Sequence, residues 1–326
     1  MRPAHCNPLA HPFALLTLVA LLWAGNVVLG RAVAGRIPPV TLNSLRWAIA
    51  LAVVLPLAWP QLAGKARIVR AHLVELALLA MPSVAIYNSF LYAGARTTSA
   101  TNAGVIVGMM PIMIVAFAAL LGQERVTWRR AAGLCASFVG VACVICKGRL
   151  AFVGELSCTP GNLMILGAAM AWGIYTVLLR RFALPLGCFA LLALLSAIGL
   201  AVSLPFCAWE LIAGARIEWS IGTAAAVLYV GVFPSVIALF LWNKAVAEVG
   251  AGTAGLFTNL IPVFSLLLAV VLLGETVERF QLVGMGLIFA GIRLATMRAR
   301  AAAPSLAPWM RLQSLPAANR RVMLER

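Results

Sequence analysis

Two stretches of the chain carry one pattern, 151 residues apart. The first, ATNAGVIVGMMPIMIVAFAALLGQERVTWRRAAGLCASFVG, runs from Ala100 to Gly140, and the second, AGTAGLFTNLIPVFSLLLAVVLLGETVERFQLVGMGLIFAG, runs from Ala251 to Gly291. An ungapped repeat of this length indicates that the chain consists of two related halves. The identical positions include Ala100, Ala103, Gly104, Pro111, Glu124, Val126, Gly133 and Gly140, which recur as Ala251, Ala254, Gly255, Pro262, Glu275, Val277, Gly284 and Gly291.

Working outward from the repeat, the composition is too apolar for a soluble protein. Of 326 residues, 63% are hydrophobic and 10% are charged, whereas a soluble domain carries about a quarter charged residues. The apolar residues form runs of about 20, the length of helix that crosses about 30 Å of hydrocarbon. Lipid offers backbone groups no partners, and the runs lack the alternation of barrel strands. We therefore expect an all-α integral membrane protein.

Ten runs predict ten transmembrane helices, five in each half. They cover residues 12–33, 39–59, 72–95, 98–121, 129–147, 161–181, 185–207, 220–242, 250–273 and 280–297. The predicted organisation is a first five-helix repeat over residues 1–147, a linker loop over 148–160, a second five-helix repeat over 161–297 and a basic tail over 298–326.

The repeat extends beyond the quoted stretches with small changes of offset, since Trp23 corresponds to Trp172 and Pro82 to Pro234. Because each half contains an odd number of helices, the second half must enter the membrane from the opposite side. The halves are therefore predicted to be inverted repeats. Such pairs build many secondary transporters, with the substrate near the midplane at the interface between the repeats.

Proline is repeated near the predicted mid-membrane level. The pairs are Pro82 with Pro234 and Pro111 with Pro262. Proline removes a backbone hydrogen bond and bends a helix. We expect four bent helices in symmetric positions, where exposed backbone groups could contribute to a site.

Lysine and arginine are distributed unevenly. With the N-terminus in the cytoplasm, sixteen of them fall on the cytoplasmic side and seven in outer loops. This bias predicts a multi-pass protein of a bacterial inner membrane with both termini cytoplasmic. We attribute the net charge of +16 to the basic residues that set the membrane topology and to the tail, which is expected to contact anionic lipid. No nucleic-acid partner is predicted.

Short motifs in both halves resemble a known family. In the first half they are Trp23-Ala24-Gly25-Asn26, Arg46, Ala100 to Pro111, and Leu121-Gly122-Gln123-Glu124 through Gly133, and in the second half Trp172, Pro262 and Leu273-Gly274-Glu275. Over residues 12–297 the chain resembles the EamA-type members of the drug/metabolite transporter superfamily. One departure is Gln123, where the first repeat of the family usually has glycine. The resemblance implies a ten-helix inverted-repeat carrier, commonly an exporter of amino acids or related metabolites.

Polar and aromatic side chains at mid-membrane level are the candidate substrate-binding residues. Trp23 and Asn26 are three residues apart and so share one helical face, as do Trp172 and Tyr175. Symmetry is expected to place these two faces opposite each other across a cavity. The full set is Trp23, Asn26, Arg46, Tyr87, Asn88, Trp172, Tyr175, Tyr229 and Asn259.

Arg46 lies about seven residues inside the outer end of its predicted helix. A charge at that depth costs on the order of 2.5 to 3.5 kcal/mol on insertion scales. The side chain could extend to the outer headgroups or bond the carbonyls of a broken helix. Alternatively, it faces the cavity and binds a carboxylate or phosphate group of the substrate. We favour the second interpretation.

No carboxylate is predicted at mid-membrane, because the chain contains no Asp and its nine Glu fall in loops, tails or helix ends. Ion coupling is then absent, carried by a helix-end residue such as Glu75, or made through backbone carbonyls. Glu124 and Glu275 are expected to organise their loops beside Arg125 and Arg279 or to cap the following helix.

Other functional classes lack the residues that they require. A membrane enzyme would need paired acids, a metal cluster or a nucleophile with its base, and Cys143 with Cys146 form a lone C-x-x-C without a nearby His. No catalytic activity, metal or cofactor is therefore predicted. The predicted function is export of a small metabolite such as an amino acid, by a monomer or weak dimer in the lipid bilayer. A carrier or exchanger of phosphate-containing, nucleotide- or lipid-linked substrates remains the alternative, because basic cavities suit phosphates.

Overall fold

The computed structural model describes residues 11–33, 35–98, 100–146, 159–273 and 278–297. All regular secondary structure in these ranges is helical. Most of the predicted linker (148–158), the basic tail (298–326) and Glu275 lie outside the described residues. The predicted all-α fold is confirmed.

The first half contains five helical columns, two of them interrupted. They are α1 (Pro12–Ala32); α2 (Pro39–Leu62); α4 (Leu73–Ala80), η2 (Met81–Ile86) and α5 (Tyr87–Ala95) in line; α6 (Ala100–Gly108) followed by α7 (Met110–Leu120); and α8 (Trp128–Ile145). A short helix, α3 (Ala66–Ala71), lies in the loop after α2. The predicted boundaries agree with these bounds within a few residues, and α3 was not predicted.

The second half repeats this order. Its columns are α9 (Pro160–Phe182); α10 (Cys188–Ile212); α11 (Ile221–Val232), η4 (Phe233–Ala238) and α12 (Leu239–Val249); α13 (Ala251–Leu256), η5 (Phe257–Asn259) and α14 (Leu260–Leu273); and α15 (Arg279–Thr296). Within the described ranges, nine columns are long and apolar enough to cross a membrane. The 18-residue α15 is not among the nine, so the count of ten crossings stays a prediction.

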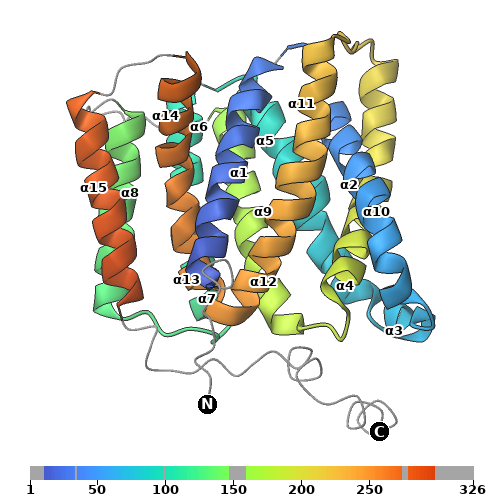
Figure 1. Cartoon of the computed structure of the whole chain (residues 1–326), viewed down its shortest axis with the longest axis horizontal. Coiled ribbons are helices and arrows are strands. Elements are labelled where there is room, and N and C mark those ends of the chain that lie inside the picture. The colour runs from blue at the N-terminus through green and yellow to red at the C-terminus, as the bar shows by residue number, and fades with distance from the viewer. Residues whose placement is uncertain (1–10, 34, 99, 147–158, 274–277, 298–326) are drawn as a thin grey trace, which may run out of the picture.

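The two halves run in opposite directions. In Figure 1, α1 rises from the lower to the upper end of the bundle, and α9, its counterpart in the second half, descends from the upper to the lower end. The final helix of each half, α8 and α15, likewise form an antiparallel pair at one side (Figure 1). This arrangement is the inverted repeat that the odd number of helices predicts.

Each of the four prolines that predict a bend lies in or beside an irregular helical turn. Pro82 lies in the π-helical turn η2, and Pro234 lies at the same place in η4. Helices α6 and α7 are interrupted at Met109, just before Pro111, and η5 is a 3₁₀ turn just before Pro262. A proline nitrogen has no hydrogen to donate, which accounts for the change of hydrogen-bond pattern at these four positions.

Glycine allows the backbones of α8 and α15 to approach closely. A Cβ on Gly140 would lie 2.6 Å from the carbonyl oxygen of Gly284, and a Cβ on Gly133 would lie 2.6 Å from that of Gly291. The repeat relates these two contacts, because Gly133 corresponds to Gly284 and Gly140 to Gly291. Small residues bring helices together in lipid, where dispersion contacts replace the hydrophobic effect.

Helices α2 and α10 cap each other's first turns. The Glu210 carboxylate, near the end of α10, accepts hydrogen bonds from the backbone N–H of Thr41 at 2.8 Å and of Val40 at 3.4 Å. Gln61, at the end of α2, accepts one from the N–H of Ala190 at 3.2 Å through its Oε1. These caps satisfy N–H groups that a helix leaves unpaired, and they fix the register of one repeat against the other.

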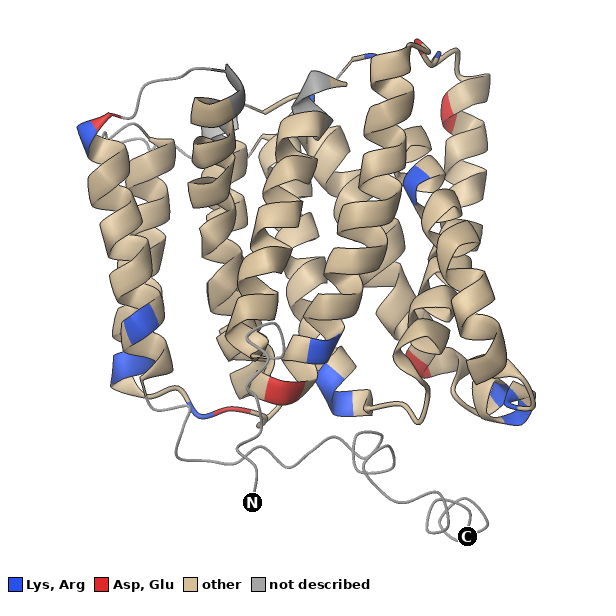
Figure 2. Cartoon of the chain, viewed as in Figure 1, with Lys and Arg blue, Asp and Glu red and all other residues tan. Residues whose placement is uncertain are grey.

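Charge gathers at the two ends of the bundle. Figure 2 shows most of the lysine and arginine at the lower ends of α3, α8, α9 and α12. We refer to this end as the basic face. It carries the loops over residues 63–72, 121–127 and 183–187 (Figure 1).

Candidate substrate-binding site

Five aromatic rings from four columns meet in the interior, and we call them the aromatic cluster. The Trp23 and Trp172 rings are 5.1 Å apart, centroid to centroid, and nearly perpendicular. Tyr87 and Tyr175 contact Trp172 at 4.9 and 5.3 Å, and Trp242 contacts Trp23 at 5.1 Å. Edge-to-face and tilted pairs at these spacings attract each other. Symmetry predicted that the faces of Trp23 and Trp172 lie opposite each other across a cavity. The two faces do meet, but the rings are in direct contact rather than separated by a cavity.

The aromatic cluster contains polar atoms that are not all satisfied. The Tyr175 hydroxyl donates to the side-chain oxygen of Asn243 at 2.6 Å, and Trp23 Nε1 donates to the Pro234 carbonyl at 3.3 Å. The Nε1 atoms of Trp172 and Trp242 are enclosed and have no hydrogen-bond partner among the described residues. A buried donor without a partner costs about 1–3 kcal/mol, so a ligand or water that accepts from these donors would be stabilised.

A second group, the Arg46 cluster, consists of Arg46, Asn26, Asn88, Tyr92 and Ser235. The Arg46 guanidinium donates to Ser235 Oγ from Nε at 2.8 Å and to the side-chain oxygen of Asn88 from Nη1 at 2.8 Å. Nη1 also donates to the Tyr92 hydroxyl at 2.9 Å. The Tyr92 hydroxyl in turn donates to Asn26 at 3.2 Å. Every partner in this cluster is neutral.

Arg46 is 3% exposed, so it does not extend to the headgroups in this structure. It bonds side chains of both repeats, and its guanidinium also lies 5.5 Å from the Trp47 ring centroid. No hydrogen bond from its remaining nitrogen, Nη2, is found among the described residues, and Nη2 is not one of the fully enclosed polar atoms. The planar fork is therefore fixed by three hydrogen bonds, with two N–H groups left for a further acceptor.

The bent segment η4 joins the two clusters. Pro234 accepts from Trp23 in the aromatic cluster, and the next residue, Ser235, accepts from Arg46. Ser235 Oγ itself donates to the carbonyl of Val230, five residues earlier in α11, at 2.6 Å. The proline bend thus turns two successive residues toward the two parts of one site.

Two predicted site residues lie apart from both clusters. Tyr229 stacks on Phe233 at 5.0 Å and donates to the Leu22 carbonyl at 3.3 Å, against a gap in α1 left by Gly25. Asn259 donates to Ser137 of α8 at 2.7 Å. Both contacts are those of helix packing.

Four residues take part in the two clusters but were not predicted: Trp242, Asn243, Tyr92 and Ser235. Ser235 has a detectable signal in the repeat, because Pro82-Ser83 corresponds to Pro234-Ser235. Trp242 has no such signal, since Phe90 occupies the corresponding position. Trp242 belongs to the aromatic cluster only because the fold brings it against Trp23 and Trp172.

The two clusters combine a guanidinium, neutral hydrogen-bonding groups and aromatic rings. Neither cluster contains a carboxylate among the described residues, and no group of three His, Cys, Asp or Glu side chains in those residues could bind a metal ion. The arrangement places one fixed cation beside a large apolar surface. It suits an amphipathic organic anion or zwitterion.

Comparison with known proteins places the chain in a family. The model of the EamA-like transporter family matches residues 12–146 and again residues 159–297, in agreement with the two structural repeats. The chain belongs to the EamA-like transporter family. Helices α1 to α8 make up the first EamA match, and α9 to α15 make up the second.

Several relatives match two thirds or more of the chain. An uncharacterized transporter, YyaM of Bacillus subtilis, is 27% identical over 80% of this chain and 86% of its own length. The aromatic amino acid exporter YddG of Ancylobacter novellus is 26% identical over 88% and 97% of the two chains. A probable terminal-alkyne amino-acid exporter of Streptantibioticus cattleyicolor is 28% identical over 68% and 73%. A solved crystal structure with 23% sequence identity superposes with a TM-score of 0.71, over 88% of this chain and 98% of the other, and shares the fold.

Proposed function

We propose that the protein exports an amino acid or a related compound with a large apolar side chain, by alternating access. The observation that carries this proposal is a buried, oriented arginine that the adjacent residues Pro234 and Ser235 link to the cluster of five aromatic rings. The substrate carboxylate would accept from Arg46 Nη2, and its side chain would pack against Trp23, Tyr87 and Trp172. Two relatives named as amino-acid exporters support this class of substrate.

A phosphate-containing substrate has less support. The described residues of the Arg46 cluster provide one cation, whereas phosphate sites commonly combine several donors around a dianion. The aromatic surface also exceeds what a compact phosphate group can cover. The alternative therefore serves as a comparison in the transport test.

Efflux from proteoliposomes tests the substrate class. We expect efflux of phenylalanine, tryptophan and leucine to exceed that of glycine by at least about tenfold, because a buried aromatic or aliphatic side chain contributes roughly 1.5–3 kcal/mol. A nucleotide sugar should leave no faster than from protein-free liposomes. Equal rates for glycine and phenylalanine, or rapid efflux of the nucleotide sugar, would contradict the proposal.

We also propose that the basic face is cytoplasmic, which places both ends of the chain in the cytoplasm. The excess of lysine and arginine at the lower ends of the helices supports this orientation (Figure 2). The exposed Arg67 lies in α3 on the basic face, and the exposed Glu218 lies in the loop between α10 and α11 at the opposite end.

Cysteine labelling tests this orientation in intact cells, on a background without the seven native cysteines. An impermeant thiol reagent should label Glu218→Cys in intact cells, and it should label Arg67→Cys only after the membrane is permeabilised. The reverse pattern would show that the orientation is inverted.

A further inference from the structure

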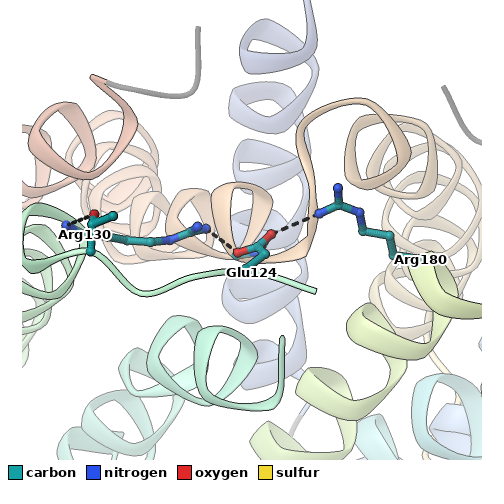
Figure 3. A network of polar contacts seen from close by, with 5 residues as sticks. Glu124, Arg130 and Arg180 are labelled. Carbon is teal, nitrogen blue, oxygen red and sulfur yellow. Dashed lines mark hydrogen bonds and ion pairs between the residues drawn. The ribbon is translucent and has the colours of Figure 1, made fainter. Parts of the chain in front are cut away.

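A charged cluster joins the two repeats at the basic face. Glu124 lies in the loop between α7 and α8, and its carboxylate contacts Arg130 Nη2 at 2.7 Å and Arg180 Nη1 at 3.1 Å (Figure 3). Its Oε1 also accepts from the backbone N–H of Gly252 at 3.2 Å. We call these four residues the Glu124 cluster. Glu124 was expected to organise its own loop beside Arg125 or to cap the following helix, but its carboxylate instead contacts Arg130, Arg180 and the N–H of Gly252. Its repeat counterpart Glu275 lies outside the described residues.

The contacts of Glu124 divide between the repeats. Arg130 belongs to α8 of the first repeat, whereas Arg180 belongs to α9 and Gly252 to α13 of the second. A neighbouring contact reinforces the link, because Gln123 Nε2 donates to the Val177 carbonyl of α9 at 3.1 Å. One short loop of the first repeat is therefore bonded to two helices of the second.

Glycine makes room for this cluster. A Cβ on Gly252 would lie 2.2 Å from Arg130 Nη2, and one on Gly250 would lie 2.4 Å from Arg180 Nη1. Gly250 has φ +88°, which favours glycine, and it separates α12 from α13. Gly250 and Gly252 therefore leave space for the ion pairs, and Gly250 also provides the turn between α12 and α13.

The cluster is mechanically connected to the substrate site through α9. Trp172, Tyr175 and Arg180 lie on that helix, and eight residues separate Trp172 from Arg180, about 12 Å along the axis. A rigid helix that moves at the site must therefore move Arg180 relative to Glu124. Side-chain exposures of 9% for Glu124 and 32% for Arg180 place the pair in a partly hydrated environment, where ion pairs are weak enough to break reversibly.

We propose that the Glu124–Arg180 pair is a gate at the basic face: it is closed in this conformation and must separate when the site opens to that side. The inference rests on the proposed transport by alternating access, which requires the repeats to part at one face at a time. The repeat also contains a second Glu and Arg at the corresponding positions of the sequence, because Glu275 corresponds to Glu124 and Arg31 corresponds to Arg180.

The chain offers a matched pair of variants. Arg180→Gln removes the ion pair between the repeats and leaves Glu124 paired with Arg130. Arg130→Gln removes the ion pair within the first repeat and leaves the gate. Each variant removes one of the two positive charges that contact the Glu124 carboxylate. A general electrostatic effect would therefore alter the two variants to the same extent.

Distances between spin labels measure the separation of the repeats directly. Labels on the exposed positions Trp128 of the first repeat and Pro185 of the second, on a background without the native cysteines, report on the basic face. We expect Arg180→Gln to raise the ratio of the longer-distance to the shorter-distance population about fivefold. Arg130→Gln should leave this ratio near wild type, and Arg180→Lys should restore it.

Salt gives a second measurement that does not require a charge variant. Raising the salt concentration from about 0.05 M to about 1 M should shift the wild-type population in the same direction, because partly hydrated ion pairs are screened. An unchanged distance distribution in Arg180→Gln, an equal shift in Arg130→Gln, or no response of the wild type to salt would overturn the gate. This readout uses no substrate, so it can fail or succeed whether or not the proposed amino-acid substrates are transported.

Discussion

Arg46→Gln should lower the rate of amino-acid export by roughly 10- to 100-fold, with a near-normal amount of folded protein in the membrane. A charge-assisted hydrogen bond contributes about 1.5–3 kcal/mol, and glutamine cannot reproduce the charge or the paired donors of Nη2. Folding should tolerate the change, since a neutral amide costs less to bury than a guanidinium.

Two further variants separate charge from orientation. Arg46→Lys keeps the charge but loses the planar fork, so we expect an intermediate rate, about tenfold below wild type. Ser235→Ala removes the acceptor of Nε and should lower the rate to a similar extent while the charge remains. The exposed Arg36 provides the control, because Arg36→Gln should transport normally. Wild-type transport by Arg46→Gln would exclude a role for the guanidinium in substrate binding.

The fold was largely predictable because its signals are local. Apolar runs determined the helices, and the repeated prolines determined the positions of the bends. Two predicted ends were wrong: α10 continues five residues further, to Ile212, and α12 continues seven residues further, to Val249. A hydropathy pattern cannot show that Glu210 in the last turn of α10 caps α2.

The candidate site was only partly predictable. Trp23 and Trp172 could be paired because the repeat relates them, and depth alone identified Arg46 as unusual. The partners of Arg46 could not be predicted, because Tyr92 and Ser235 reach it from different columns and different repeats. Spacing along one helix shows which residues share a face, but it does not show what lies opposite that face.

The same limit applies to the small residues. Small residues four positions apart on a helix predict close packing against another helix, and Gly104 and Gly108 are packed in this way against Ile145 and Val141 of α8. Gly286 has the same spacing to Ala290, yet a Cβ on Gly286 would have no neighbour within 4 Å. The prediction that this glycine packs against another helix is wrong within the described chain. The motif occurs on a face of α15 that no described helix covers.

The covered face of α15, which packs against Gly140 of α8, and its open face at Gly286 together give the prediction with the largest expected effect on stability. Gly140→Leu should abolish or greatly reduce the folded protein. Its Cβ would lie 2.6 Å from the Gly284 carbonyl oxygen and 2.8 Å from the Ile288 nitrogen. These atoms belong to the backbone of α15 and cannot move aside as a flexible side chain would. Overpacking in a well-packed core usually costs about 1–3 kcal/mol, and separating two helix backbones should cost at least the upper end of that range.

Gly286→Leu is the matched control, because it adds the same side chain to the same helix pair in open space. Size-exclusion profiles in detergent, together with thermal unfolding curves, should show a normal monodisperse peak for Gly286→Leu and little or no such peak for Gly140→Leu. Contact between helices in lipid depends on dispersion and close approach rather than on exclusion of water. Loss of the close approach therefore removes the main attraction between α8 and α15. If Gly140→Leu unfolded at the same temperature as wild type, the two helices would not be packed backbone to backbone.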